Sequence, residues 1–340
     1  MEPLSIIAYF DGIPGHEKQT RGILQVMSAI TATVVIHKKV VVSSSAYCKN
    51  WAAYFLSSLR NPGAENNLGP VDLIIGTGTH THIPMLLEKN ARSKLADKQV
   101  RVVTCMSPDT ILRRKFDLCC IPIHDDPLPR ENVFVTLGPP GPVVFEKKHN
   151  SDRGLILIGG LDKKSHTWNS RTIAGQIQAI ITKHPSMQWT VSSSPRTPED
   201  TCKTIEDMAF SNQQLSFYRS QNTPAGWIEE QYALHGIVWV TADSISMVYE
   251  ALSAGCSVGI LPVEWLQQDN KFQKSLNILY EKKMTVNFNE WLTGTKMPVG
   301  SVEPFNEAER CAREILRRWW PERLQEHIYS INLKQAMRQA

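Results

Sequence analysis

The sequence lacks the short motifs that mark several large enzyme classes. It has no GxxxxGK(S/T) loop, no GxSxG segment and no HExxH helix. These absences argue against a P-loop nucleotidase, a serine hydrolase of the α/β type and a zinc metalloprotease. The pair Asp125-Asp126 comes closest to a metal-binding acidic run, but Pro127 follows directly and favours a turn. We therefore predict no metal site and no bound cofactor.

The sequence also lacks paired cysteines and long apolar runs. Its seven cysteines include no CxxC pair, and adjacent Cys119 and Cys120 lie in an apolar stretch typical of core packing. Such usage suits free thiols in a reducing compartment. No apolar run approaches the roughly 20 residues that a membrane-spanning helix needs, and no signal-peptide pattern precedes the first expected strand. We expect a cytoplasmic protein, at most peripheral on the cytoplasmic face of an inner membrane.

Charge and length set the remaining limits. A formal net charge of +4 is too small to indicate a nucleic-acid partner. A hydrophobic content of 42% with 21% charged residues is that of an ordinary globular protein. The 340 residues suit two domains, at roughly 150 residues per domain.

A repeated strand–loop–helix pattern runs along the chain and predicts the α/β class, with parallel sheets covered by helices on both faces. Strands are expected at residues 4–10, 33–36, 40–42, 71–75, 100–105, 118–122, 133–136, 155–158, 189–191, 215–218, 237–241 and 257–261. Helices are expected at residues 17–29, 51–59, 83–87, 171–184, 198–209, 225–234, 244–254, 270–282, 304–320 and 322–340.

Residues 137–142 interrupt this pattern with three prolines and two glycines, which can continue neither a helix nor a central strand. We place the domain linker there. The predicted organisation is an N-terminal acceptor-side domain at 1–140, a C-terminal nucleotide-sugar domain at 151–303, and a helical tail at 304–340 that packs on the first domain.

Residues 237–262 form the most informative stretch of the second half. An apolar strand ends at Asp243, and the hydroxyl side chains of Ser244 and Ser246 stand where they could cap the next helix. Gly255 predicts the end of that helix. Glu250, about one and a half turns along, could accept hydrogen bonds from a ribose diol, or it could be an ordinary solvated glutamate.

Two further strand ends in the second half are rich in hydrogen-bond donors. Gly159-Gly160 precede Lys163, a combination suited to a diphosphate. Ser194, Arg196 and Thr197 follow the next strand and offer an anion-binding fork, or simply a polar turn. Because the carboxyl ends of parallel strands meet at one edge of a sheet, we expect these loops to converge with Ser244.

The first half offers two candidate loops. His16 follows Gly15 at the start of a helix, and a neutral histidine there could take a proton from an attacking hydroxyl, or be only a turn histidine. Asp11 and Glu17 flank it and could orient or replace it. The second loop comprises Gly76, Thr77 and Gly78, with Thr79, Thr81 and either His80 or His82 available to bind hydroxyl groups.

Four segments resemble the bacterial proteins named after the plant mitochondrial-fission protein "elongated mitochondria". They are residues 12–19, Gly159-Gly160 with Lys163 and Trp168, residues 194–198, and residues 241–250. More distantly, the layout is similar to GT-B glycosyltransferases, including the enzyme that adds N-acetylglucosamine to the lipid-linked peptidoglycan precursor. Cys256-Ser257 stand where those enzymes usually have proline after the glycine region.

This resemblance implies two Rossmann-like domains facing a cleft, with C-terminal helices crossing back to the first domain. It implies metal-independent sugar transfer to a hydroxyl of an envelope glycolipid or related acceptor, with His16 as the base. The implied donor-binding residues are Gly160, Lys163, Ser194, Arg196, Thr197, Ser244, Ser246, Met247, Glu250, Asn270 and Lys271. On the acceptor side they are Gly15, Gly76, Thr77, Gly78 and His80.

Two other functions stay open. A sugar-nucleotide 2-epimerase on the same fold would need acids facing the sugar, for which Asp109, Glu264 and Glu17 are the candidates. A non-enzymatic adaptor would keep the fold and bind protein partners.

The tail carries a further ambiguity. Five arginines surround Trp319-Trp320, a combination that could contact a membrane surface or could pack on the first domain.

Overall fold

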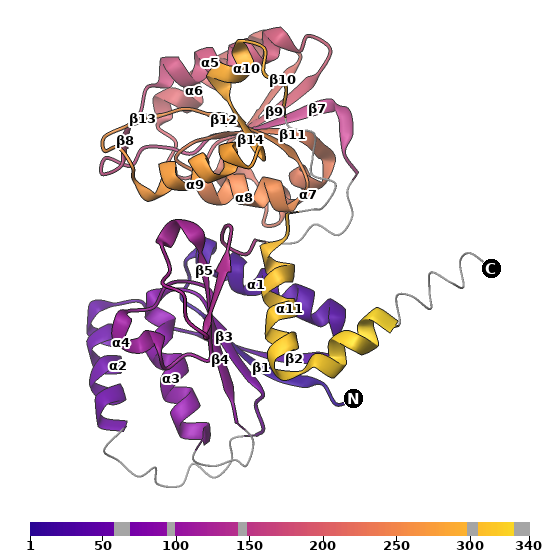
Figure 1. The fold of residues 1–340 in the computed structure, drawn as a ribbon. Coiled ribbons are helices and arrows are strands. Elements are labelled where there is room, and N and C mark those ends of the chain that lie inside the picture. Colours follow the sequence, from indigo (N-terminus) through magenta and orange to yellow (C-terminus); the bar gives the residue numbers. More distant parts are fainter. Residues whose placement is uncertain (58–68, 94–98, 142–147, 298–304, 330–340) are drawn as a thin grey trace, which may run out of the picture. The chain divides into compact units, whose positions relative to one another are not determined.

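The computed structural model describes residues 1–57, 69–93, 99–141, 148–297 and 305–329. It divides into two compact units, one formed by Met1–Pro142 with Glu307–Ala340 and the other by Val143–Asn306. Each unit is built on a six-stranded, wholly parallel sheet with helices on both faces (Figure 1). The predicted α/β class is therefore confirmed.

The sheet of the first unit has the order β2-β1-β3-β4-β5-β6. Its strands are β1 (Leu4–Phe10), β2 (Thr33–Lys39), β3 (Leu73–Gly76), β4 (Arg101–Thr104), β5 (Leu118–Pro122) and β6 (Val133–Thr136). One face is covered by α1 (Pro14–Ile30) and α11 (Glu307–Trp319), and the other by α2 (Ser44–Ser57), α3 (Thr79–Ser93) and α4 (Thr110–Arg113) (Figure 1). A short 3-10 turn, η1 (Ile123–Asp125), follows β5.

The sheet of the second unit has the order β10-β9-β7-β11-β12-β14. Its strands are β7 (Asn150–Leu157), β9 (Gln188–Ser192), β10 (Leu215–Tyr218), β11 (His235–Thr241), β12 (Ser257–Leu261) and β14 (Thr285–Asn287). The helices α5 (Ser170–Lys183), α6 (Glu199–Ser211) and α10 (Phe288–Leu292) lie on one face, and α7 (Trp227–Leu234), α8 (Ile245–Ser253) and α9 (Lys271–Glu281) on the other (Figure 1). An antiparallel ribbon of β8 (His166–Thr167) and β13 (Glu264–Trp265) and the turn η2 (Ser220–Asn222) complete the unit.

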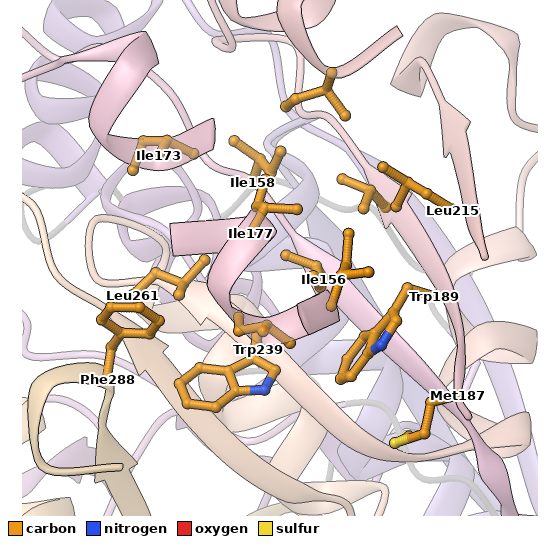
Figure 2. Close-up of a cluster of buried hydrophobic side chains, with 14 of the residues drawn as sticks. Ile156, Ile158, Ile173, Ile177, Met187, Trp189, Leu215, Trp239, Leu261 and Phe288 are labelled. Atoms are coloured by element: carbon orange, nitrogen blue, oxygen red, sulfur yellow. The ribbon is translucent and has the colours of Figure 1, made fainter. Parts of the chain in front are cut away.

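Two tryptophans dominate the core of the second unit. Trp189 of β9 and Trp239 of β11 are almost fully buried among isoleucines of β7 and α5 (Figure 2). Glycines on neighbouring strands make room for both rings. A Cβ on Gly154 would lie 2.2 Å from the ring of Trp189, and one on Gly259 would lie 2.4 Å from the ring of Trp239. These strand glycines are therefore explained by packing.

The element predictions fail mainly at boundaries and short elements. Residues 40–42 are not a strand, because the chain leaves the sheet at Lys39 to enter α2. The loop expected through His82 ends earlier, since α3 already begins at Thr79. The predicted linker has no regular structure at residues 137–141. Parts of the predicted helices at 58–59, 304 and 330–340 lie outside the described residues, and β8, β13, β14, α4 and α10 were not predicted.

The C-terminal segment returns to the first unit, as predicted. Helix α11 packs on α1 and β6, and Arg323 donates to Thr31 Oγ1 at 3.0 Å and to the Glu2 carbonyl at 2.9 Å. Trp319 lies under the guanidinium of Arg101, with 5.3 Å to the ring centroid.

The tail arginines are engaged within the chain. Arg310, Arg313, Arg317 and Arg318 each pair with a glutamate of α11. This arrangement favours the packing alternative for the tail. Among the described helices, none has the length and apolar character to cross a bilayer.

Candidate functional site

Both sheets bring loops together at the point where the strand order reverses direction. In the first unit the chain runs outward in opposite directions from β1 and β3, and in the second unit from β7 and β11. Loops leaving the carboxyl ends of such neighbouring strands diverge to opposite faces and leave a crevice, which is where α/β proteins bind ligands. The candidate loops of both units lie at these two places.

In the first unit, Asp11 and His16 form a hydrogen-bonded dyad. Asp11 follows β1 directly, and its Oδ2 lies 2.8 Å from His16 Nδ1 in the first turn of α1. The carboxylate is fully buried, whereas the imidazole keeps 28% of its surface exposed. Because a carboxylate accepts, Nδ1 carries the proton of this bond, and in a neutral imidazole Nε2 then has the lone pair. This is the tautomer that a general base requires.

Glycines at two positions with positive φ make this dyad possible. Gly12 has a φ of +78° directly after Asp11, and Gly78 has a φ of +109° in the loop that follows β3. A Cβ on Gly78 would lie 2.1 Å from Asp11 Oδ2 and 2.6 Å from His16 Nδ1. Gly78 therefore carries no side chain because the dyad occupies that space.

Hydroxyl groups tie the two loops of the first unit together. Thr77 Oγ1 lies 2.9 Å from Thr20 Oγ1 of α1, and Thr81 donates to the Gly78 carbonyl at 2.7 Å. Gly76 is equally constrained, since a Cβ there would lie 2.8 Å from Met85 Sδ. The two predicted loops are thus one constellation, in which Thr77 has a structural role.

Other predicted residues of the first unit lie around this dyad. Glu17 accepts from the Gly12 N–H at 3.2 Å and from Arg21, so it closes the loop while Asp11 orients His16. Gly15 faces open space, since a Cβ added there would have no atom within 4 Å. The ring of His80 lies edge-on to that of Tyr47 of α2, with ring centroids 5.5 Å apart.

His82 was the alternative to His80 in the second predicted loop. It is 1% exposed, its Nε2 lies 3.2 Å from Thr104 Oγ1, and its buried Nδ1 has no partner in the described chain. Burial, together with the nearby charge of His16, lowers the pKa of His82 to about 4, although Asp11 acts in the opposite direction. His82 is therefore neutral at physiological pH.

This lowered pKa predicts acid destabilisation of the first unit. The unfolded chain binds a proton at His82 near pH 6.5 and the folded chain only near pH 4, so the free energy of unfolding falls as the pH falls through this window. The loss reaches about 3 kcal/mol for a shift of this size. Urea unfolding at several pH values should show a shallower fall for His82→Gln than for the wild type. Equal slopes would contradict the buried, neutral state of His82.

In the second unit, three loops meet at the carboxylate of Asp243. Asp243 Oδ2 accepts from the Gly160 N–H at 3.0 Å, from Arg196 Nη2 at 3.0 Å and from Ser244 Oγ at 3.1 Å. The loops after β7, β9 and β11 therefore converge, as predicted. The role of Asp243 as the hub of these loops was not predicted, because in the sequence it is only one of several polar residues at strand ends. Its Oδ1 is buried, with no partner among the described residues.

Gly159 and Gly160 lie so close to neighbouring atoms that neither position has room for a side chain. A Cβ on Gly159 would lie 2.1 Å from Asp243 Oδ2, and one on Gly160 would lie 2.1 Å from the Arg196 backbone. Ser194 Oγ and Thr197 Oγ1 both donate to the Gly159 carbonyl. The hydroxyls of Ser194 and Thr197 thus hold the loops in place, and the Gly160 N–H already has an acceptor.

Arg196 remains the most available donor of the cluster. One side of its guanidinium is fixed, by Asp243 and by the Gly160 carbonyl at 3.3 Å from Nη1. Its side chain is nevertheless 47% exposed. An arginine held in this way can still present its remaining N–H groups to an anion.

Helix α8 begins without the predicted side-chain cap. Ser244 occupies the N-cap position, but its hydroxyl donates to the Asp243 carboxylate and accepts no bond from the N–H groups of the first turn. The expectation that Ser244 caps the helix is therefore wrong. In the first turn, the Met247 N–H bonds to the Ser244 carbonyl at 2.9 Å, which leaves the N–H groups of Ile245 and Ser246 as the ones that can bind an anion. Ser246 is exposed and Met247 half-buried at this end.

Glu250 lies in the middle of α8 and is 8% exposed. The hydroxyl of the fully buried Tyr232 donates to its Oε2 at a long 3.5 Å. Burial and the charge of Glu250 raise the pKa of Tyr232 well above its usual value, which keeps the phenol protonated as a donor. Gly255, with a φ of +75°, ends the helix as predicted.

The remaining predicted donor residues differ in environment. Lys163 is exposed. Asn270 forms a capping box with Gln273 at the start of α9, so its amide is used locally. Lys271 lies over the ring of Phe272, with 5.4 Å to the centroid.

Comparison with known sequences decides the family. The sequence model of a family described as mitochondrial fission ELM1 matches residues 14–319, which is most of the chain. This protein belongs to the mitochondrial fission ELM1 family. The matched span includes His16, the loop after β3 and the loops of the second unit, whereas Asp11 and Gly12 lie before it. A search of curated proteins gives no match to this ELM1-family chain.

Solved structures similar to this ELM1-family protein include enzymes of nucleotide-sugar chemistry. A candidate UDP-N-acetylglucosamine 2-epimerase from Listeria monocytogenes has a TM-score of 0.51 at 10% identity, covering 93% of this chain and 95% of that one. MnaA of Staphylococcus aureus, solved with UDP, has a TM-score of 0.48 at 13% identity, covering 92% and 96%. Phytolacca americana UGT2, complexed with UDP-2-fluoro-glucose and pterostilbene, has a TM-score of 0.47 at 10% identity, covering 98% and 93%.

At these identities the similarity concerns the fold. The ELM1-family protein has two Rossmann-like domains with parallel sheets, a fold similar to that of the candidate UDP-N-acetylglucosamine 2-epimerase.

Proposed function

We propose that this ELM1-family protein is a glycosyltransferase that moves a sugar from a nucleotide-sugar donor to a hydroxyl of a glycolipid or saccharide acceptor. The observation that carries the proposal is the Asp11–His16 dyad, with its 2.8 Å hydrogen bond at the switch point of the first sheet. Burying a carboxylate costs free energy, so packing alone does not explain a buried carboxylate that orients a partly exposed imidazole. It suits removal of a proton from an attacking hydroxyl.

In this proposal His16 Nε2 takes the proton of the acceptor hydroxyl as its oxygen attacks the anomeric carbon of the donor. The bond between that carbon and the diphosphate oxygen breaks, and the nucleoside diphosphate leaves with the electron pair. Asp11 stabilises the imidazolium that forms, because its carboxylate already accepts from Nδ1. Gly15, Gly76, Gly78 and His80 shape the acceptor side.

The donor is assigned to the second unit. Arg196 and the first turn of α8, with Ser246 and Met247, would meet the diphosphate, and Lys163 would add a mobile positive charge. A helix N-terminus and a guanidinium can stabilise a leaving diphosphate without a metal ion. Glu250 would accept from the ribose. Gly160, Ser194, Thr197 and Ser244 would contribute by holding the loops, since their polar groups are bonded internally.

Nucleotide binding provides the direct test. A thermal-shift screen with UDP, GDP, ADP and CMP should raise the Tm with at least one of them, because a ligand that binds only the folded state stabilises it. Arg196→Gln should weaken that binding about tenfold or more, the loss of a charge-assisted hydrogen bond of roughly 1.5–3 kcal/mol. Lys203→Gln, on the neighbouring helix α6, is the matched control. No shift with any nucleotide or nucleotide-sugar would contradict the proposed function.

The same protein distinguishes the alternatives. Interconversion of free UDP-sugars without an acceptor would indicate a 2-epimerase. Of its candidate acids, Glu17 is bonded to the Gly12 N–H, Glu264 accepts from Thr167 at 2.9 Å, and Asp109 is exposed before α4. An adaptor would bind its partners equally well with or without an intact dyad.

A further inference from the structure

Helix α2 has no buried side chain between residues 44 and 56. Helix α1, on the other face of the same sheet, buries six residues. Apolar residues on a surface helix normally face the core, and the outward stripe normally carries charge. In α2 the exposed positions recur at helical spacing, but apart from Ser44, Ser45 and Lys49 they are Cys48, Ala52, Ala53, Phe55 and Leu56.

The outward side chains are large as well as apolar. Phe55 is 58% exposed and Leu56 50% exposed, and Val41, just before the helix, is 72% exposed. The inward side chains Trp51 and Tyr54 pack against the core of the first unit, so the orientation of α2 is fixed. Trp51 also stacks on Phe55, with centroids 5.5 Å apart. The exposed apolar surface is therefore held outward by the packing behind it.

The charge of this segment has one sign. Residues 33–57 contain three lysines and no aspartate or glutamate. Lys38 pairs with Glu88 of α3, whereas Lys39 and Lys49 are exposed and have no carboxylate partner in the described chain. Exposed aromatic and aliphatic side chains can enter the acyl boundary of a bilayer, and neighbouring lysines are attracted to anionic lipid headgroups.

We propose that α2 and the segment before it, represented by Val41, Phe55, Leu56, Lys39 and Lys49, dock on an anionic lipid bilayer. The lysines would meet lipid phosphates while the apolar side chains enter the acyl boundary. A second copy of the chain fits less well, because residues 33–57 offer no carboxylate to the lysines of a symmetric partner. Protein interfaces also tend to be depleted in lysine.

This docking surface differs from the Trp/Arg tail, whose arginines are paired within the chain. It does not depend on the proposed catalytic function. Within the first unit, the ring of Tyr47 of α2 contacts that of His80, so the helix that carries the docking surface also contacts the acceptor loop. If the proposed function holds, the surface would bring the acceptor loop close to lipid-linked hydroxyls.

Vesicle flotation of the full chain tests the proposal. The wild type should float with phosphatidylcholine vesicles containing phosphatidylglycerol, and much less with phosphatidylcholine alone or at high salt. Phe55→Ser/Leu56→Ser should reduce the partition constant about tenfold or more, since each side chain buries apolar area on insertion. Lys39→Gln/Lys49→Gln should remove the preference for anionic vesicles.

Matched controls separate this surface from others. Phe210→Ser removes a 97% exposed phenylalanine from α6, and Arg313→Gln/Arg317→Gln alters the tail. Both should float like the wild type. No flotation of the wild type, equal flotation of the Phe55→Ser/Leu56→Ser variant, or self-association of the wild type that this variant abolishes would each overturn the proposal. Because the replaced side chains are exposed, circular dichroism should show all variants folded.

Discussion

Replacing His16 with asparagine is expected to lower kcat for sugar transfer by about 10²–10⁴-fold, the usual contribution of a general base. The imidazole is partly exposed in the first turn of α1, so its loss removes no core packing. The affinity for the donor nucleotide should stay near that of the wild type, because we propose that the donor binds to the other unit. Steady-state kinetics with the donor that the binding screen identifies would measure the change.

Asp11→Asn tests the same dyad through the negative charge of its carboxylate. Asparagine keeps the shape of the buried side chain but cannot stabilise an imidazolium through a negative charge. We expect kcat to fall here too, with unchanged nucleotide binding. A matched control is Glu17→Gln, which should leave kcat within a few-fold because Glu17 bonds to the loop backbone. Full transfer activity in His16→Asn would contradict the role of His16 as base, and retained partner binding without any transfer would favour the adaptor alternative.

The fold was predictable because its main signals are local. Strands β1 and β5 are nearly continuous apolar runs, as expected for strands buried on both faces of a parallel sheet. Helix α8 ends at Gly255 for a reason visible in sequence, the need for a positive φ. Short elements such as β8 and β13 escaped because two-residue strands exist only through their pairing with each other.

The candidate sites were predictable as loops but not as bonding networks. The sequence placed His16 and Asp11 near a glycine turn, yet it could not show that Gly78, 67 positions after Asp11 in the chain, leaves space for their hydrogen bond. Nor could it show that Asp243 gathers Gly160, Arg196 and Ser244. Such hubs depend on which strands become neighbours. One signal for Asp243 was present in the sequence, because it follows closely after an apolar strand. A carboxylate buried at such a place needs hydrogen-bond partners.

The buried histidine follows the same rule. His82 lies in the stretch that local pattern assigns to a loop, and only the early start of α3 turns it inward, away from solvent. The sequence left His80 and His82 open as alternatives, and the implied acceptor-side set contained only His80, the more exposed of the two. The distinction between the two is set by helix phase, which a helix start predicted four residues too late does not show.

Gly78→Ala is expected to lower the rate of transfer as much as His16→Asn does, although no reacting group is removed. An alanine Cβ would lie 2.1 Å from Asp11 Oδ2, so the carboxylate or the loop must move and the 2.8 Å bond to His16 is lost. The backbone φ of +109° is also unfavourable for any residue with a Cβ, at a cost on the order of 1–3 kcal/mol. Activity and the free energy of unfolding should therefore fall together.

The control for this substitution is Gly15→Ala in the neighbouring loop. Gly15 lies in α1, and a Cβ there would have no atom within 4 Å, so alanine should leave the dyad intact and stabilise the helix by up to about 1 kcal/mol. The two glycines look alike in sequence, each beside a candidate catalytic loop. Chemical denaturation should show a lower free energy of unfolding for Gly78→Ala and a higher one for Gly15→Ala. Transfer assays should show the loss of activity in Gly78→Ala. If Gly78→Ala keeps its activity, the dyad does not need its observed geometry, and a direct catalytic role for Asp11 and His16 would have to be abandoned.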